Sequence, residues 1–289
     1  MIDLQLAQLI VNGIALGCII ALASVGLTLT CGILRLSNFA HGDLLTLGAY
    51  LALLGNSMGL NIWLAIALAI VGTVLISLVT EKLIWAPMRD RRADSTTLII
   101  ISIGLALFIR NGLIFIWGGG NQTYDLPVQP ALDFWGLKVK TYSLVVVVLT
   151  AIATVGLHFL LQKTKIGKAM RAVADDTDLA LVTGINVNRV VIWTWVIAAG
   201  LTALGGGMYG LLEAVRPNMG WFLILPMFAS VILGGIGNPY GAIAGSLIVG
   251  LAQEVSTYWL PTEYKLAVAL LMVIVVLLIR PQGLFKGTA

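Results

Sequence analysis

The sequence predicts an all-α membrane protein that crosses the bilayer several times, with about 8–9 transmembrane or partly re-entrant helices in a single domain over residues 1–289. Three observations predict this fold class. The composition is 59% hydrophobic and only 10% charged, which leaves more apolar surface than a 289-residue globule can bury. Runs without charge repeatedly reach the roughly 20 residues that a spanning helix needs. Lysine and arginine also gather on alternate connections between those runs.

Nine apolar segments give the predicted helices. In chain order they are residues 6–33, 38–55, 61–85, 96–117, 142–162, 190–212, 221–236, 240–258 and 264–280. Turn-forming residues at Gly55 to Asn61 and at Gly234 to Pro239 divide two charge-free runs that are long enough for two crossings each. Segments 38–55, 221–236 and 240–258 are short, and the sequence leaves open whether they cross the bilayer fully or re-enter it.

The positive charges predict an N-terminus outside and a C-terminus in the cytoplasm. This orientation puts twelve residues at inner loops and helix ends, namely Arg35, Lys82, Arg89, Arg91, Arg92, Lys163, Lys165, Lys168, Arg171, Arg189, Arg280 and Lys286. Four lie outside, namely Lys138, Lys140, Arg216 and Lys265, and Arg110 falls inside a span. The reverse orientation would place four of these basic residues inside and twelve outside. The segment 163–189 is therefore predicted to be cytoplasmic, and the irregular loop 118–140 is predicted to be an external cap.

Residues 163–189 form a charged island in an otherwise apolar chain, with 8 of the 30 charged residues in 27 positions. The bilayer does not require such a segment, whereas a docking partner does. Apolar residues rimmed by both signs of charge would make a compact knob suited to a groove in another protein. The alternative is a solvated connector between two spans.

Capping residues divide this island into two predicted helices. The first is Gly167 to Ala174, and the second is Thr177 to Thr183. An aspartate, Asp175 or Asp176, is the expected N-cap of the second helix, and Gly184 is its expected C-terminal cap.

Three strings resemble one family of transport proteins. The first, Gly167-Lys168-Ala169-Met170-Arg171-Ala172, is followed by a short acidic turn and looks like the coupling loop of ABC importer permeases. The other two are Asn38-Phe39-Ala40-His41-Gly42-Asp43 and Gly234-Gly235-Ile236-Gly237. Together they resemble permeases of the branched-chain amino acid ABC transporters, and the LivH-type subunit more closely than the LivM-type. The resemblance covers nearly the whole chain. Asp43 stands where a Glu is common, which keeps the charge.

The resemblance implies a function and a set of partners. It implies a permease subunit of an ABC importer that carries branched-chain or other neutral amino acids across the bacterial inner membrane. The implied partners are two ATP-binding subunits, a second permease of the LivM type and an extracytoplasmic substrate-binding protein, without nucleic acid and without a cofactor. The residues implied in ATPase coupling are Gly167, Lys168, Arg171, Ala172, Asp175, Asp176 and Gly184.

The sequence has no ATPase site of its own. A G-x-x-x-x-G-K-[ST] phosphate loop is absent, because Gly167 and Lys168 are followed by Ala169 and Gln162 stands where the first glycine should be. Motifs of membrane proteases and metalloenzymes, and paired intramembrane carboxylates, are absent as well. The protein is therefore expected not to be an enzyme, to bind no metal and to depend on a separate ATPase.

Polar residues and glycines near the spans are the candidates for a translocation path or gate, namely Asn12, Asn38, His41, Asp43, Gly237, Gly241 and Gly245. Polar groups at membrane depth are costly, which favours a function. An interfacial turn at the inner end of the first helix pair, with Asn38 as N-cap, is the alternative for the three residues near position 40. The glycines recur every four residues, which fits close packing better than a path wall. Arg110 has no evident partner and is expected to be structural.

Two alternatives to the amino acid importer stay open. One is the same importer class carrying urea, short amides or a sugar. The other is a stand-alone channel or secondary carrier, for which a cytoplasmic docking knob is hard to explain. The sequence gives neither the residues that contact the substrate nor the choice between a homodimeric and a heterodimeric permease core.

Overall fold

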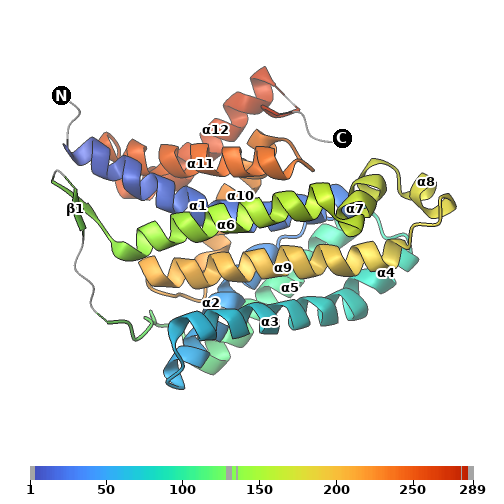
Figure 1. The fold of residues 1–289 in the computed structure, drawn as a ribbon, viewed down its shortest axis with the longest axis horizontal. Coiled ribbons are helices and arrows are strands. Elements are labelled where there is room, and N and C mark those ends of the chain that lie inside the picture. The colour runs from blue at the N-terminus through green and yellow to red at the C-terminus, as the bar shows by residue number, and fades with distance from the viewer. Residues whose placement is uncertain (1–3, 128–131, 135, 281, 286–289) are drawn as a thin grey trace.

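Helix α1, Leu4–Leu34, is the centre of the bundle in the computed structural model, which describes residues 4–127, 132–134, 136–280 and 282–285. More than half of its residues are buried, because α6, α9, α10 and α11 all pack along it (Figure 1). The predicted all-α membrane fold is confirmed, apart from one short hairpin of β1, Leu132–Phe134, and β2, Leu137–Val139. Lys286 and part of the loop 118–140 lie outside the described residues.

All nine predicted segments are helical, with ends that differ from the prediction by a few residues. After α1 the main helices are α2 (His41–Ser57), α3 (Ile62–Thr80), α5 (Ser95–Trp117), α6 (Thr141–Lys163), α9 (Val187–Leu212), α10 (Met219–Gly234), α11 (Pro239–Val255) and α12 (Lys265–Ile279). A π-helical turn, Glu81–Trp85, continues α3 into α4, Ala86–Asp90. Two 3-10 turns, Ser256–Tyr258 and Thr262–Tyr264, lie between α11 and α12. The charged island contains α7, Lys165–Asp175, and α8, Thr177–Val182.

Length and composition separate these helices into two groups. Six helical segments of the described chain are long and apolar enough to cross a membrane, namely Leu4–Leu34, Ile62–Asp90, Ser95–Trp117, Thr141–Lys163, Val187–Leu212 and Thr262–Ile279. Helices α2, α10 and α11 are shorter, with 17, 16 and 17 residues. They correspond to the three segments whose full crossing the sequence left open.

Helices α2 and α10 begin inside the bundle, and their first turns meet. His41 Nε2 lies 2.9 Å from the carbonyl oxygen of Ala23, which is well inside α1, and 2.8 Å from Thr202 Oγ1, which is well inside α9. The backbone of Gly220 in α10 contacts that of Gly42 so closely that a Cβ on Gly42 would lie 2.3 Å from the Gly220 oxygen. The start of α2 is therefore at mid-depth, and the prediction of a turn at the inner end of the first helix pair is wrong.

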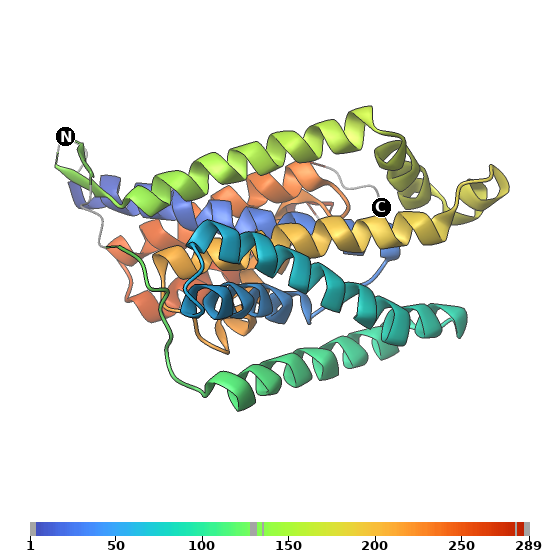
Figure 2. The same cartoon turned by 60° about the horizontal axis from the view of Figure 1, so that its bottom comes forward.

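The two ends of the bundle carry different structures. Figures 1 and 2 place the start of α1 and the β hairpin at one end, and α7 and α8 at the opposite end. At the hairpin end, the Gln8 side chain accepts from the Lys138 backbone N–H and donates to its carbonyl, both at 3.0 Å. Gln122 and Val215 form a β-bridge, and the Tyr124 hydroxyl donates to the Ala49 oxygen at 3.1 Å. The described part of loop 118–140 is thus tied to α1, α2 and the chain after α9.

Candidate functional site

Helix α7 folds back against the end of α6. Thr164 joins the two helices, and its Oγ1 accepts the Gly167 N–H at 3.0 Å. A Cβ on Gly167 would lie 2.3 and 2.4 Å from the backbone oxygens of Leu160 and Leu161, so the reversal requires glycine. The Arg171 guanidinium then donates to Gln162 Oε1 at 2.6 Å. These contacts hold α7 firmly on α6.

Helix α7 is anchored, whereas α8 projects from the bundle. Met170 and Val173 on α7 are buried in a cluster with residues of α1, α6 and α9, which α8 joins only through Ala180. Asp176 caps α8 as predicted, because its Oδ1 accepts the N–H groups of Asp178 and Leu179 at 2.9 Å. Gly184 follows α8 with φ +85°, a conformation that favours glycine. The island is therefore a folded pair of helices.

The outer surface of the island combines charge with apolar side chains. Leu179, Leu181 and Val182 on α8 are exposed, and Val182 is 81% exposed. Of the implied coupling residues, Lys168, Arg171, Asp175 and Asp176 are exposed and Ala172 is half-buried. Figure 2 shows α8 standing clear of the other helices. Exposed apolar groups at a helix that the bundle does not cover are typical of a protein contact surface.

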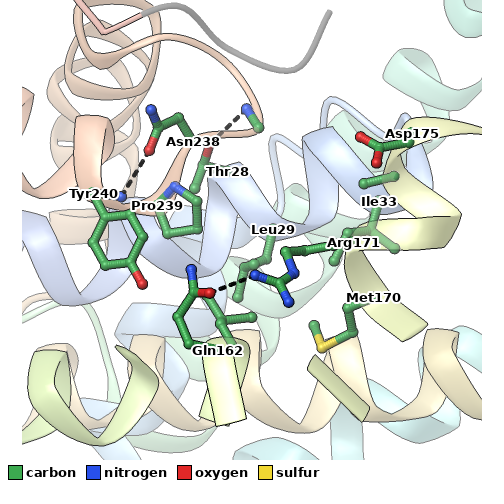
Figure 3. A pocket seen from close by; sticks show the side chains of 13 residues that line it. Thr28, Leu29, Ile33, Gln162, Met170, Arg171, Asp175, Asn238, Pro239 and Tyr240 are labelled. Atoms are coloured by element: carbon green, nitrogen blue, oxygen red, sulfur yellow. Dashed lines mark hydrogen bonds between the residues drawn. The ribbon is translucent and has the colours of Figure 1, made fainter. Parts of the chain in front are cut away.

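A cavity of about 230 Å³ separates the island from the turn before α11. Figure 3 shows Arg171 and Asp175 of α7 on one side, and Asn238 and Tyr240 on the other. The turn is fixed to α1, because Thr28 Oγ1 accepts the Gly237 N–H at 2.9 Å. Coupling candidates and one path candidate, Gly237, therefore line the same cavity.

The other two glycine candidates are packing contacts. A Cβ on Gly241 would lie 2.1 Å from the Gly234 oxygen, and one on Gly245 would lie 2.3 Å from the Ser230 oxygen. Both glycines are buried between α10 and α11. Close approach of two helix backbones explains why both positions are glycine.

Asn12 lies at the opposite end of the bundle, beside a polar cavity of about 250 Å³. Its lining includes the carboxylates of Glu213 and Glu254, and Ala15, Leu16 and Ile19 of α1. The ammonium of Lys265 pairs with Glu254 at 2.5 Å, and two further lysines, Lys138 and Lys140, also line the cavity. Charges of both signs and apolar side chains thus line the same cavity.

Asn38, His41 and Asp43 lie in the middle of the bundle and are buried. Asn38 Oδ1 accepts the Ala40 N–H at 3.0 Å, but Ala40 and not Asn38 is the N-cap position of α2. The Asn38 amide nitrogen and His41 Nδ1 are buried without a hydrogen-bond partner among the described residues. These three residues are therefore core groups and not an interfacial turn.

Asp43 has a partner that sequence reasoning missed. Arg110 on α5 donates from Nε to Asp43 Oδ1 at 3.0 Å and from Nη2 to Asp43 Oδ2 at 2.9 Å. The guanidinium also stacks over the Trp221 ring, with 4.9 Å between its central carbon and the ring centroid. The available signal was the presence of one acid and one base within separate apolar segments, since such charges pair inside a membrane.

Comparisons with known proteins agree on one family. Residues 9–277 match the family model described as "Branched-chain amino acid transport system / permease component". The chain is 31% identical over 298 residues to the high-affinity branched-chain amino acid transport system permease protein LivH of Escherichia coli strain K12, which covers 97% of this chain and 96% of LivH. It is 28% identical to the permease protein BraD of Pseudomonas aeruginosa, with coverage of 96% and 94%.

A solved structure shares the fold. It is PsaBC from Streptococcus pneumoniae in complex with Fab, with a TM-score of 0.50, 17% identity, and coverage of 93% of this chain and 91% of the other. This likeness agrees with a polytopic membrane fold. With the family match over most of its length, the chain belongs to the permease component family of branched-chain amino acid transport systems.

Proposed function

We propose that this chain is the membrane-spanning permease subunit of an ABC importer for branched-chain or other neutral amino acids in the bacterial inner membrane. The observation that carries the proposal is the island of α7 and α8, in which one helix is fixed to the bundle and the next presents Leu179, Leu181 and Val182 outward. The E. coli and P. aeruginosa relatives, both named as branched-chain amino acid permeases, support the cargo.

The partners follow from what the chain lacks. Its sequence has no phosphate loop, so the energy of ATP reaches it from other subunits. We infer two ATP-binding subunits at the island, a second permease beside this chain and an extracytoplasmic substrate-binding protein at the other end. The excess of Lys and Arg near the island supports a cytoplasmic location for α7 and α8 and an external location for the β hairpin.

Motion would pass from the ATPase to the spans through rigid contacts. Closure of the ATPase pair moves α8, and α7 moves with it through the short turn at Asp176. The clamp of Gly167 and Arg171 on α6 then displaces the end of α6. Displacement of α7 also changes the width of the cavity in Figure 3 between α7 and the turn at Gly237, and the spans rearrange between outward and inward access.

The cargo's path begins at the polar cavity beside Asn12. Its charges of both signs suit the ammonium and carboxylate of a free amino acid, and its apolar lining residues suit an aliphatic side chain. Asn38, His41 and Asp43 lie farther inward, at the level where α2 and α10 begin.

Reconstitution tests this function directly. The chain is purified with its partner subunits, placed in lipid vesicles and supplied with the binding protein loaded with radioactive L-leucine. ATP-dependent uptake, with ATPase subunits recovered on the chain, is the expected result. Uptake by the purified chain alone, without ATP, would replace this proposal by a stand-alone carrier. Uptake of urea or a sugar in place of leucine would show that the importer carries a different substrate.

A further inference from the structure

The ion pair of Asp43 and Arg110 is accessible from outside the protein on the Arg110 side only. The Asp43 side chain is 1% exposed, whereas that of Arg110 is 14% exposed. Arg110 uses Nε and Nη2 for Asp43, and its Nη1 makes no hydrogen bond to any residue that the structure describes. Nη1 is also not one of the polar atoms that are fully buried without a hydrogen-bond partner. A guanidinium has five N–H donors, so hydrogen-bonding capacity remains at its accessible edge.

The accessible edge of Arg110 does not fit a lipid environment. Arg110 lies about two turns from the nearer end of α5, and a charge open to acyl chains at that depth is costly. Only five of the 23 residues of α5 are buried, and Figure 2 shows α5 along the edge of the bundle. Trp221, stacked on the guanidinium, is itself 41% exposed. The accessible edge of Arg110 therefore calls for a polar group beside it, from a partner subunit or from the cargo.

The surroundings favour a negative ligand. Asp43 balances the charge of Arg110, and the first turns of α2 and α10 meet beside the pair, with Gly220 donating its N–H to Thr46 Oγ1 at 3.0 Å. Helix N-termini carry a partial positive charge. Broken or short membrane helices use such N-termini at mid-depth to hold anionic groups of substrates. A carboxylate that arrives here meets the free donors of a fixed guanidinium, and the partial positive charge of the first turns of α2 and α10 opposes the repulsion from Asp43.

We propose that the free edge of Arg110 binds the carboxylate of the transported amino acid near the middle of the membrane, an inference that rests on the function proposed above. Nη1 and the second hydrogen of Nη2 supply the donors. Arginine suits this task because its planar donors match the two oxygens of a carboxylate. Asp43 is a positioning residue, since it holds the guanidinium without touching the cargo.

Ligand titration tests the site apart from transport. The purified complex with its partner subunits is titrated with L-leucine, 4-methylpentanoate and L-leucinamide, and tryptophan emission is recorded. The complex with Trp221→Phe is the blank, so the difference reports the ring that stacks on Arg110. We expect L-leucine and 4-methylpentanoate, which carry the carboxylate, to give a saturable change in emission. L-leucinamide, which lacks the carboxylate, should give none. An equal response to leucinamide, or no response that depends on Trp221, overturns the proposal.

Matched variants separate binding from folding. D43N/R110Q removes both charges, so no unpaired charge stays in the span, and the carboxylate signal should disappear. R110K keeps the charge without the planar donors and should weaken leucine binding about 10-fold. The control E81Q/R89Q removes another ion pair, between Glu81 and Arg89, and should leave the titration unchanged. Retained carboxylate binding by D43N/R110Q would show that Arg110 is not the carboxylate site.

Transport distinguishes the two proposals. In vesicles, D43N/R110Q should deliver about 10- to 100-fold less leucine per ATP than the wild type, the effect of a lost charged hydrogen-bond pair. Normal delivery by this variant overturns the carboxylate site and leaves the importer function intact. If the wild type moves no amino acid but its carboxylate titration saturates, the importer function fails and the site stands.

Discussion

A Cβ atom on Gly167 would lie 2.4 Å from the backbone oxygen of Leu161, so α7 can fold back on α6 only because position 167 has no side chain. The contact is between backbones, which cannot yield as a flexible side chain would. It makes α6, a span, and α7, the anchored half of the island, one rigid unit. We therefore expect force applied to the island to be transmitted to the membrane part of the chain.

Replacing Gly167 by alanine should separate the two helices. The methyl group would collide with two carbonyl oxygens, and we expect a loss of about 1–3 kcal/mol of stability, typical of overpacking. The thermal unfolding temperature of the purified complex measures this loss. The control is Gly156→Ala in α6, the helix that α7 packs against, where an added Cβ meets nothing within 4 Å. That variant should be neutral or slightly stabilised. Equal stability of the two variants would contradict the packing argument.

Replacing Asp176 by alanine should fray α8. Asp176 Oδ1 accepts two backbone N–H groups, and loss of such an N-cap costs about 1 kcal/mol. Amide hydrogen exchange in α8 should become about fivefold faster, while exchange in α7 stays unchanged. Asp178→Ala is the matched control, since Asp178 lies in the same turn without a capping bond. Equal effects of both replacements would show that the cap is unimportant.

The exposed apolar residues of α8 should be needed for the ATPase subunit. L181S/V182S removes apolar contact area from a surface that the bundle does not cover, so the unfolding temperature should stay within a degree or two of the wild type. Recovery of the ATPase subunit with the chain should fall. Asp178→Asn, an exposed polar position on the same helix, should leave recovery unchanged. Full recovery with L181S/V182S would remove α8 from the interface.

Glu81 should be important for stability and not for transport chemistry. Its carboxylate is nearly buried, accepts the Trp195 Nε1–H at 2.6 Å and pairs with Arg89. E81Q keeps an oxygen for Trp195 and loses the charge, whereas E81L loses both contacts. We expect E81L to lower the unfolding free energy by about 1–3 kcal/mol more than E81Q, because it leaves a buried donor unsatisfied. Thermal unfolding of both variants checks the order, and the reverse order would refute the hydrogen bond.

The sequence was sufficient for the helices and for the island. Composition predicted the membrane class, and the nine apolar segments are all helical because long apolar runs leave the backbone no other way to satisfy its hydrogen bonds in lipid. Asp176 and Gly184 were recognisable as caps because capping is a local property of a few residues.

Mid-depth contacts between distant segments could not be read from the sequence. The Asn38 to Asp43 stretch follows Arg35, which suggested an inner turn, but the chain turns back into the bundle and His41 reaches α1 and α9. Pairing of Asp43 with Arg110 depends on how α5 packs against α2, which local patterns do not encode. The glycine spacing of α11 predicted close packing, which the structure has at Gly241 and Gly245.

The ratio of leucine taken up to ATP hydrolysed tests the coupling role of the island most directly. The measurement compares wild type and Arg171→Ala in vesicles with all partner subunits and loaded binding protein. Arg171 donates to Gln162 across the junction of α7 and α6, and loss of a charged hydrogen bond of this kind corresponds to about a tenfold effect. The account predicts continued ATP hydrolysis with a ratio about tenfold lower. A ratio equal to that of the wild type, for Arg171→Ala and for Gly184→Val alike, would contradict it.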